Sequence, residues 1–192
     1  MAKANFLVES PRGYERICIE DEFLTNNREL FLTEAVDADT SVELIKQFMY
    51  LDRKNPGKEI TFYINSPGGD VYSGLGLYDT IMRLKSPVKT VCLGTCASMG
   101  SILFLTGSKR EIREHGRLMI HDASFGEADF SHMKPDEIRQ KSDDLLKTSL
   151  LLRQIVADRT GQSINTVAKM MKKDSYFNAE EAIEFGLATL IN

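Results

Sequence analysis

The sequence lacks the long apolar segments found in membrane-spanning and exported proteins. No apolar run approaches the roughly 20 residues that a transmembrane helix needs. Residues 1–15 carry Lys3, Glu9, Arg12 and Glu15 around one short apolar stretch, which is not typical of a secretory signal. We therefore expect a cytoplasmic protein.

Cysteine and histidine are scarce, with three of each. Cys18, Cys92 and Cys96 stand at unrelated spacings, and the last two lie among apolar or small residues, which favours buried reduced thiols. The sequence has no second cysteine pair and no His-x-x-x-His motif. We expect no metal and no cofactor.

Concentrated positive charge and phosphate-binding motifs are also missing. The net charge is -4, the basic residues are scattered, and Lys172-Lys173 is too short to form a surface for nucleic acid. Neither G-x-x-x-x-G-K-[ST] nor G-x-G-x-x-G occurs. This chain therefore has no visible means of hydrolysing ATP.

What the chain does have is a regular alternation of helical and strand-like segments, which predicts one α/β domain in 192 residues. A capping box at Thr40–Glu43 predicts a helix start, and Pro135 starts a helix that spans more than about 35 Å. We expect that long helix to turn Ile138, Leu145, Leu152 and Ile155 inward and to pack against a partner. The predicted strands are 60–64, 88–93, 109–112, 117–120 and 188–191, the predicted helices are 40–54, 71–82, 99–105, 135–160, 163–171 and 179–185, and the turns are 65–69 and 94–98.

Two residues stand where catalytic groups are commonly held. His121 ends the apolar strand 118–120, so it is either a core histidine or a general base, whereas His115 and His132 lie in polar turns and are expected to be solvated. Ser98 sits between a strand and a helix, in a setting that resembles a nucleophile elbow but also suits a plain N-cap. The turn 66–69 (SPGG) is either an oxyanion-binding turn or an ordinary tight turn.

Several blocks, in order along the chain, resemble the signature of the proteolytic subunits of Clp proteases. They are YINSPGG at 63–69, YDT at 78–80, ASMG at 97–100, MIH at 119–121, DSYF at 174–177 and EAIEFGL at 181–187. The resemblance covers the chain from about residue 12 to its end. It implies a single domain over residues 1–192 of the ClpP/crotonase-like fold with repeated β-β-α units, an axial segment at 1–15 and a handle at about 122–160.

Carried over position by position, the resemblance implies a serine endopeptidase that cuts unfolded proteins and short peptides. Ser98 becomes the nucleophile, His121 the base and Asp174 the carboxylate that orients the histidine, while the N–H groups of Gly69 and Met99 form the oxyanion hole. Sequence pattern alone would not single out Asp174 among 28 acidic residues. The resemblance also implies stacked heptameric rings, a tetradecamer with internal sites, fed by an AAA+ unfoldase.

The sequence departs from the family pattern at several positions. Residues 122–127 (DASFGE) replace Gln-Pro and a run of glycines, and Lys172-Lys173 replaces a common Asp-Arg pair, so ring stacking is expected to differ. Thr61 and Arg83 replace aromatic residues of the unfoldase-docking cleft, which predicts a more polar cleft. Two alternatives stay open, namely a crotonase-like acyl-CoA enzyme and a catalytically silent Clp ring component.

Overall fold

The computed structural model describes residues 5–11, 13–126 and 130–192, and its centre is a largely parallel sheet. Neighbouring strands of the main path all run parallel, in the order β3 (Glu29–Leu32), β4 (Ile60–Ser66), β5 (Val88–Ala97), β6 (Lys109–Ile112) and β9 (Leu190–Ile191). Strand β7 (Arg117–Ile120) pairs with the far end of β5, and β8 (Ser175–Phe177) runs antiparallel to β7. The predicted α/β fold class is confirmed.

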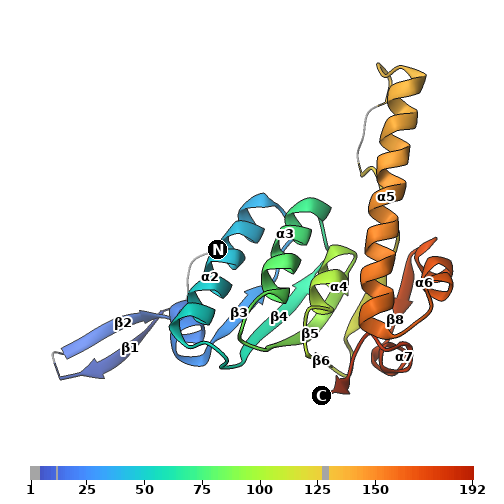
Figure 1. Cartoon of the computed structure of the whole chain (residues 1–192). Helices are drawn as coiled ribbons and strands as arrows, with labels where there is room; N and C mark the ends of the chain where they lie inside the picture. The colour runs from blue at the N-terminus through green and yellow to red at the C-terminus, as the bar shows by residue number, and fades with distance from the viewer. Residues whose placement is uncertain (1–4, 12, 127–129) are drawn as a thin grey trace.

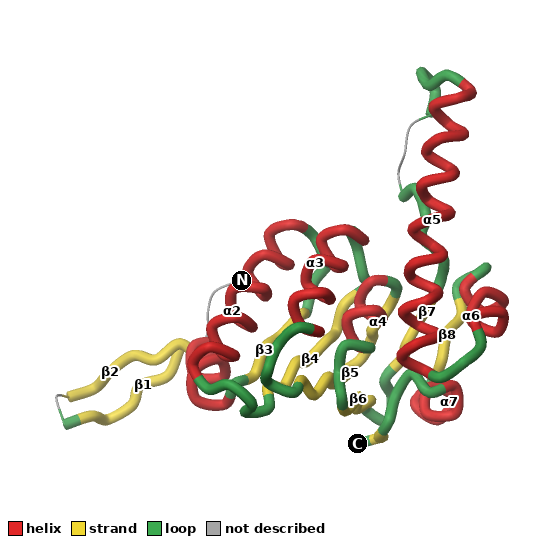
Figure 2. The backbone as a smooth tube through the Cα atoms, viewed as in Figure 1, coloured by secondary structure: helices red, strands yellow, loops and turns green. Residues whose placement is uncertain are grey.

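Helices cover the sheet and bury its apolar side chains. In Figure 1, α2 (Ala38–Lys54), α3 (Val71–Met82) and α4 (Met99–Phe104) lie in a row along one face of the sheet. Figure 2 shows α6 (Ile164–Met171) and α7 (Ala179–Phe185) beside β7 and β8. The rings of Phe48, Phe62 and Phe104 are fully buried between these layers. Burying large apolar side chains from both layers is what holds the sheet and its helices together.

Most helix boundaries follow local capping signals. Helix α7 has the predicted bounds and begins with a capping box, in which Asn178 and Glu181 exchange side-chain to backbone hydrogen bonds. Helix α2, in contrast, begins at Ala38, because the Asp37 carboxylate accepts a hydrogen bond from the Thr40 N–H. The predicted capping box at Thr40–Glu43 was therefore wrong, since a stronger cap lies three residues earlier.

Strand β5 is longer than the sequence predicted. The segment 94–98 was expected to be a turn, but the strand continues to Ala97. The additional residues are held by pairing with β7, which places Thr95 opposite Arg117 and Ala97 opposite Met119. The small residues at this end therefore belong to the sheet, and the chain turns only at Ser98.

Helix α5 (Pro135–Thr160) has the predicted bounds and projects well beyond the body of the molecule (Figure 1). Its buried side chains are confined to the second half, at Ser149, Leu152, Val156 and Ala157. Ile138 and Leu145 are only half-buried, so the expected inward face does not extend along the whole helix. In the described part of the chain, no helix is both long enough and apolar enough to cross a membrane.

The N-terminal region contains structure that the sequence analysis did not predict. Strands β1 (Asn5–Ser10) and β2 (Gly13–Cys18) form an antiparallel hairpin that extends away from the body (Figure 1). A short helix α1 (Ile19–Glu22) and a π-helical turn η1 (Phe23–Asn27) connect the hairpin to β3. The proposed axial role of residues 1–15 stays a prediction, and residues 1–4 and 12 lie outside the described ranges.

Candidate active site

The register between β5 and β7 brings Ser98 and His121 to the same end of the sheet. Ala97 pairs with Met119, so Ser98 leaves β5 beside the point where His121 leaves β7. The Ser98 N–H donates to the Met119 carbonyl at 2.9 Å. The buried Ser101 hydroxyl lies 2.6 Å from the Cys96 carbonyl oxygen and 2.8 Å from that of Met119, and it bridges the two strand ends. The junction is thus fixed by backbone and side-chain contacts.

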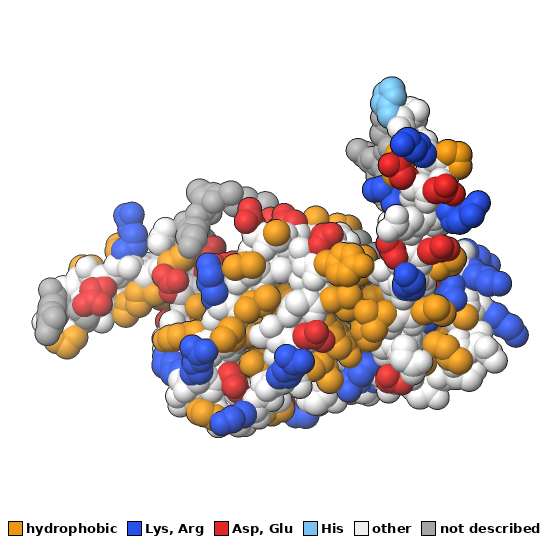
Figure 3. All heavy atoms as spheres, turned by 45° about the horizontal axis from the view of Figure 1, so that its top comes forward, with side chains coloured by type: hydrophobic (Ala, Val, Ile, Leu, Met, Phe, Trp, Pro, Cys, Tyr) orange, Lys and Arg blue, Asp and Glu red, His pale blue; other side chains and the backbone are white. Residues whose placement is uncertain are grey.

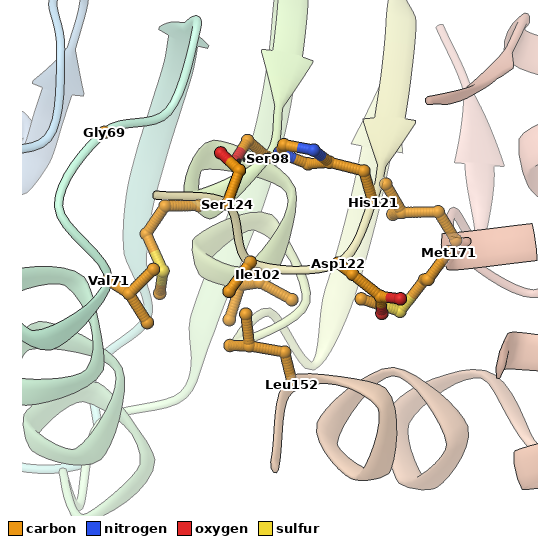
Figure 4. A pocket seen from close by; sticks show the side chains of 12 residues that line it. Gly69, Val71, Ser98, Ile102, His121, Asp122, Ser124, Leu152 and Met171 are labelled. Atoms are coloured by element: carbon orange, nitrogen blue, oxygen red, sulfur yellow. Dashed lines mark hydrogen bonds between the residues drawn. The ribbon is translucent and has the colours of Figure 1, made fainter. Parts of the chain in front are cut away.

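Ser98 adopts an unusual backbone conformation. Its φ of 53° and ψ of −121° lie in a region that non-glycine residues rarely occupy, as expected for a strained strand-to-helix turn. Its side chain makes no cap hydrogen bond to α4. Instead, the Ser98 Oγ lies 2.8 Å from the His121 Nε2, and Figure 4 shows the His121 ring reaching toward Ser98. The plain N-cap interpretation of Ser98 was therefore wrong.

Asp174 lies on the opposite side of the imidazole ring. Strand β8 pairs with β7 so that Ser175 faces Ile120, and this pairing carries the preceding Asp174 to His121. The Asp174 Oδ1 is 3.4 Å from the His121 Nδ1, which is longer than an ordinary hydrogen bond. The Asp174 side chain is 59% exposed, against 23% for His121. The contact is thus an ion pair at moderate range when the imidazole is protonated.

The glycine turn after β4 packs directly against Ser98. A Cβ atom on Gly68 would lie 2.7 Å from both the Ala97 carbonyl oxygen and the Ser98 Cβ, and one on Gly69 would lie 2.1 Å from the Val36 carbonyl oxygen. Both residues have positive φ, at 95° and 149°. Both positions therefore require glycine, because a side chain on Gly68 would collide with Ser98 and one on Gly69 would collide with the Val36 backbone.

A cavity opens beside Ser98 and His121, and Gly69 and Met99 contribute to its wall. Among the described residues, neither the Gly69 N–H nor the Met99 N–H makes a hydrogen bond to a protein acceptor. Apolar side chains from α3, α4, α5 and α6 form much of the remaining lining, and Figure 4 labels four of them: Val71, Ile102, Leu152 and Met171. Asp122 and Ser124 add polar groups to the wall. The cavity therefore combines a nucleophile and a base with backbone donors and an apolar surface.

Comparison with known proteins identifies the family. The family model described as Clp protease matches residues 13–192. "ATP-dependent Clp protease proteolytic subunit 1" of Prochlorococcus marinus subsp. pastoris is 36% identical over 187 residues, which is 96% of this chain and 93% of that protein. "ATP-dependent Clp protease proteolytic subunit 2" of Parasynechococcus marenigrum is 38% identical over 181 residues, which is 93% of this chain and 89% of that protein. The chain belongs to the Clp protease family.

Membership in the Clp protease family confirms the prediction of a Clp-type proteolytic subunit, a peptidase. It speaks against the alternative of an acyl-CoA enzyme. His115 and His132 are both exposed, in turns near β7 and before α5 respectively, as the polar sequence around each predicted. Of the three histidines, His121 is the one that the structure brings to Ser98.

Two charged residues near the cavity were not identified as functional from the sequence. Asp122, noted only as a departure from the Clp protease pattern, pairs with Arg153 of α5. The hydrogen bond from Arg153 to Asp122 raises the pKa of the guanidinium, so Arg153 remains charged. A charge directly after His121 was the only available signal. Its partner, 31 residues away, could not be recognised without the fold.

Proposed function

We propose that this Clp protease family member is a serine-type endopeptidase with Ser98 as nucleophile, His121 as general base and Asp174 as the orienting carboxylate. The observation that carries the proposal is the 2.8 Å contact between the Ser98 Oγ and the His121 Nε2 at the edge of a cavity. A serine hydroxyl is a weak nucleophile unless a neighbouring base removes its proton. The contact supplies that base.

The reaction follows from this geometry. The Ser98 Oγ bonds to the carbonyl carbon of the scissile peptide while its proton passes to the His121 Nε2. The C–N bond then breaks, and His121 gives the proton to the leaving amine, which leaves an ester on Ser98. Water attacks that ester with His121 again taking a proton, the peptide acid departs, and the proton returns to Ser98.

The surrounding groups stabilise charge that develops during these steps. Asp174, 3.4 Å from the His121 Nδ1, holds the ring orientation and offsets its transient positive charge. The N–H groups of Gly69 and Met99 are the proposed oxyanion hole, since both line the cavity and lack protein acceptors in the described structure. Removing one such donor typically raises the activation barrier by about 3 kcal/mol.

A serine-directed fluorophosphonate probe tests the assignment. We expect intact mass to show one probe per chain and peptide mapping to place it on Ser98. The rate of fluorogenic peptide hydrolysis should fall in proportion to the fraction of chains labelled. Ser98→Ala should take up no probe, keep the native mass of the assembly and lose peptide hydrolysis. Ser108→Ala, at an exposed serine outside the cavity lining, is a control for serine loss, because a labelled and active Ser108 variant shows that the effect is specific to Ser98.

Two outcomes of the same experiment would contradict the proposal. Normal peptide turnover by Ser98→Ala would refute the nucleophile assignment. An assembled wild-type protein that neither binds the probe nor cuts peptides would instead favour the alternative of a catalytically silent ring component.

Self-association is the second part of the proposal. Leu146, Leu150 and Leu151 of α5 are 60%, 56% and 49% exposed, and exposed apolar clusters commonly mark protein interfaces. Figure 3 shows that the projecting part of α5 also carries charged side chains of both signs. We propose that α5 packs against other copies of the chain in stacked heptameric rings. Native mass spectrometry should then give a tetradecamer.

An ATP-dependent unfoldase is the proposed partner, because the related proteins are named as subunits of ATP-dependent proteases. A groove between α2 and α3 is lined by Met49, Arg53, Asp79, Arg83 and Leu84. Arg83 is exposed at its edge, which supports the expectation of a more polar docking surface. The expected cytoplasmic location stays a prediction.

A further inference from the structure

We infer that Arg153 and Asp122 are positioning residues, which hold His121 in line with Ser98 by tying the end of β7 to helix α5. The inference rests on the proposed role of His121 as base. Asp122 directly follows His121, and its carboxylate receives two hydrogen bonds from one guanidinium. The Arg153 Nε donates to the Asp122 Oδ1 at 2.7 Å, and the Nη2 donates to the Oδ2.

The backbone around this pair is anchored from two further directions. The Asp122 N–H donates to the Met171 carbonyl at 2.7 Å, at the end of α6. The next N–H, that of Ala123, donates to the Ser149 Oγ of α5 at 3.2 Å. Residues 121–126 form no helix or strand, so these contacts supply the restraint that the sheet no longer provides beyond β7.

The ion pair is sheltered enough to be strong. The Asp122 side chain is 23% exposed and that of Arg153 is 16% exposed, whereas ion pairs elsewhere on α5 are more than half exposed. Two parallel hydrogen bonds from a guanidinium also fix the orientation of the carboxylate, which a lysine could not do. The pair therefore restrains both the position and the direction of the chain after His121.

The direction of the side chains separates positioning from direct chemistry. In Figure 4 the Asp122 carboxylate points away from Ser98, while the His121 ring points toward it. Asp122 is thus not a substitute for Asp174, which contacts the His121 Nδ1. Arg153 lies next to Leu152, which lines the cavity, so a shift of α5 would move the base and the apolar wall together.

Arg153→Met tests the inference, because methionine keeps much of the apolar stem and removes both hydrogen bonds. A displacement near 1 Å at a reacting group can lower the rate by roughly 100-fold. We expect kcat to fall by about 10- to 100-fold, with KM for a short peptide within about 2-fold of wild type. Arg153→Lys should recover part of the loss. Lys147→Met, which breaks the exposed pair with Asp144 on the same helix, is the matched control and should leave kcat unchanged.

The double variant Asp122→Asn with Arg153→Met shows whether the two residues act as a unit. Its kcat should be close to that of the worse single variant, because one interaction cannot be lost twice. All rates are measured on purified protein that has the native mass of the wild-type assembly. They are expressed per Ser98 labelled by the fluorophosphonate, so unfolded chains do not contribute. Asp122→Asn alone provides the same test if Arg153→Met does not assemble.

Two results would overturn the inference. One is an unchanged kcat per titrated site in Arg153→Met or in Asp122→Asn. The other is a double variant whose loss is the product of the two single losses. Both leave the proposed function intact, since its failure would show separately as a wild-type protein without Ser98 labelling.

Discussion

At the scale of single residues, the site depends on one contact and the strain that maintains it. Ser98 occupies a positive φ with its hydroxyl 2.8 Å from the His121 ring, while Gly68 packs against it too closely for any side chain. Strained backbone at such a position persists only where the neighbouring structure enforces it. Here the N–H of Ser98 and the hydroxyl of Ser101 both connect to the Met119 carbonyl.

The protonation state of His121 should control the rate. The imidazole must be neutral to take the Ser98 proton, so we expect kcat/KM for a fluorogenic peptide to rise from acid toward mildly alkaline pH. The measurement is the initial rate across that range, with assembly verified at each pH by light scattering. The probe-labelled protein serves as the blank. A flat profile with constant assembly would contradict the role of His121 as base.

At the scale of secondary structure, helix caps position the loops around the cavity. The Asp70 carboxylate accepts a hydrogen bond from the Ser73 N–H at 2.7 Å and begins α3 directly after the Gly68-Gly69 turn. The hydrogen bond with Ser73 lowers the pKa of Asp70, because it favours the charged carboxylate. The cap therefore restrains the chain on one side of the cavity.

Removing this cap should destabilise the fold in a pH-dependent way. We expect Asp70→Ala to lower the free energy of unfolding by about 1 kcal/mol at neutral pH. Because the folded pKa is depressed, this stabilisation is full above the unfolded carboxyl value of about 3.9 and disappears as pH falls through the lower folded value. Urea unfolding at fixed protein concentration measures the difference. Asp79→Ala, on the same helix but outside the cap, should change stability by less than about 0.5 kcal/mol.

At the scale of the whole molecule, the chain is a Clp protease family domain with a cavity beside Ser98 and a projecting helix α5. The Clp protease family match spans the domain from residue 13 to the end. A folded substrate is about 5–15 kcal/mol more stable than its unfolded form, so only a small fraction is available to a sheltered site at any moment. The chain carries no nucleotide-binding motif. A partner with ATPase activity is therefore the proposed source of unfolded substrate.

The polar side chains of the groove between α2 and α3 should weaken the binding of the proposed unfoldase. We expect the chain alone to cut short peptides but not a stably folded reporter, and to pair weakly with a standard bacterial unfoldase. Arg83→Phe together with Thr61→Tyr should strengthen ATP-dependent degradation of a tagged reporter, because the first makes the groove more apolar and the second adds an aromatic side chain on β4, outside the groove lining. The same variants carrying Ser98→Ala are the controls.

Efficient degradation of the folded reporter by the chain alone would refute the dependence on an unfoldase. Strong coupling by the wild type, without improvement in the double variant, would refute the role given to Arg83 and Thr61 and leave the catalytic proposal untouched.

The sequence by itself determined those features that depend on neighbouring residues. The bounds of α5 and α7 and the strands β6 and β7 were all predicted correctly, because periodicity and capping act within a few residues. The same local patterns marked Ser98 and His121 as candidates. Asp174 came only from the family resemblance, since no local pattern distinguishes it.

Only the tertiary structure decided how distant segments meet. Pairing of β5 with β7 extended β5 through the expected turn and set Ser98 beside His121, and pairing of β7 with β8 carried Asp174 to the imidazole. The ion pair between Asp122 and Arg153 joins a loop and a helix that lie 31 positions apart in the sequence. No sequence pattern links the two residues. Sheet register and helix docking depend on burial summed over many contacts, and for that reason the chain shows them only when folded.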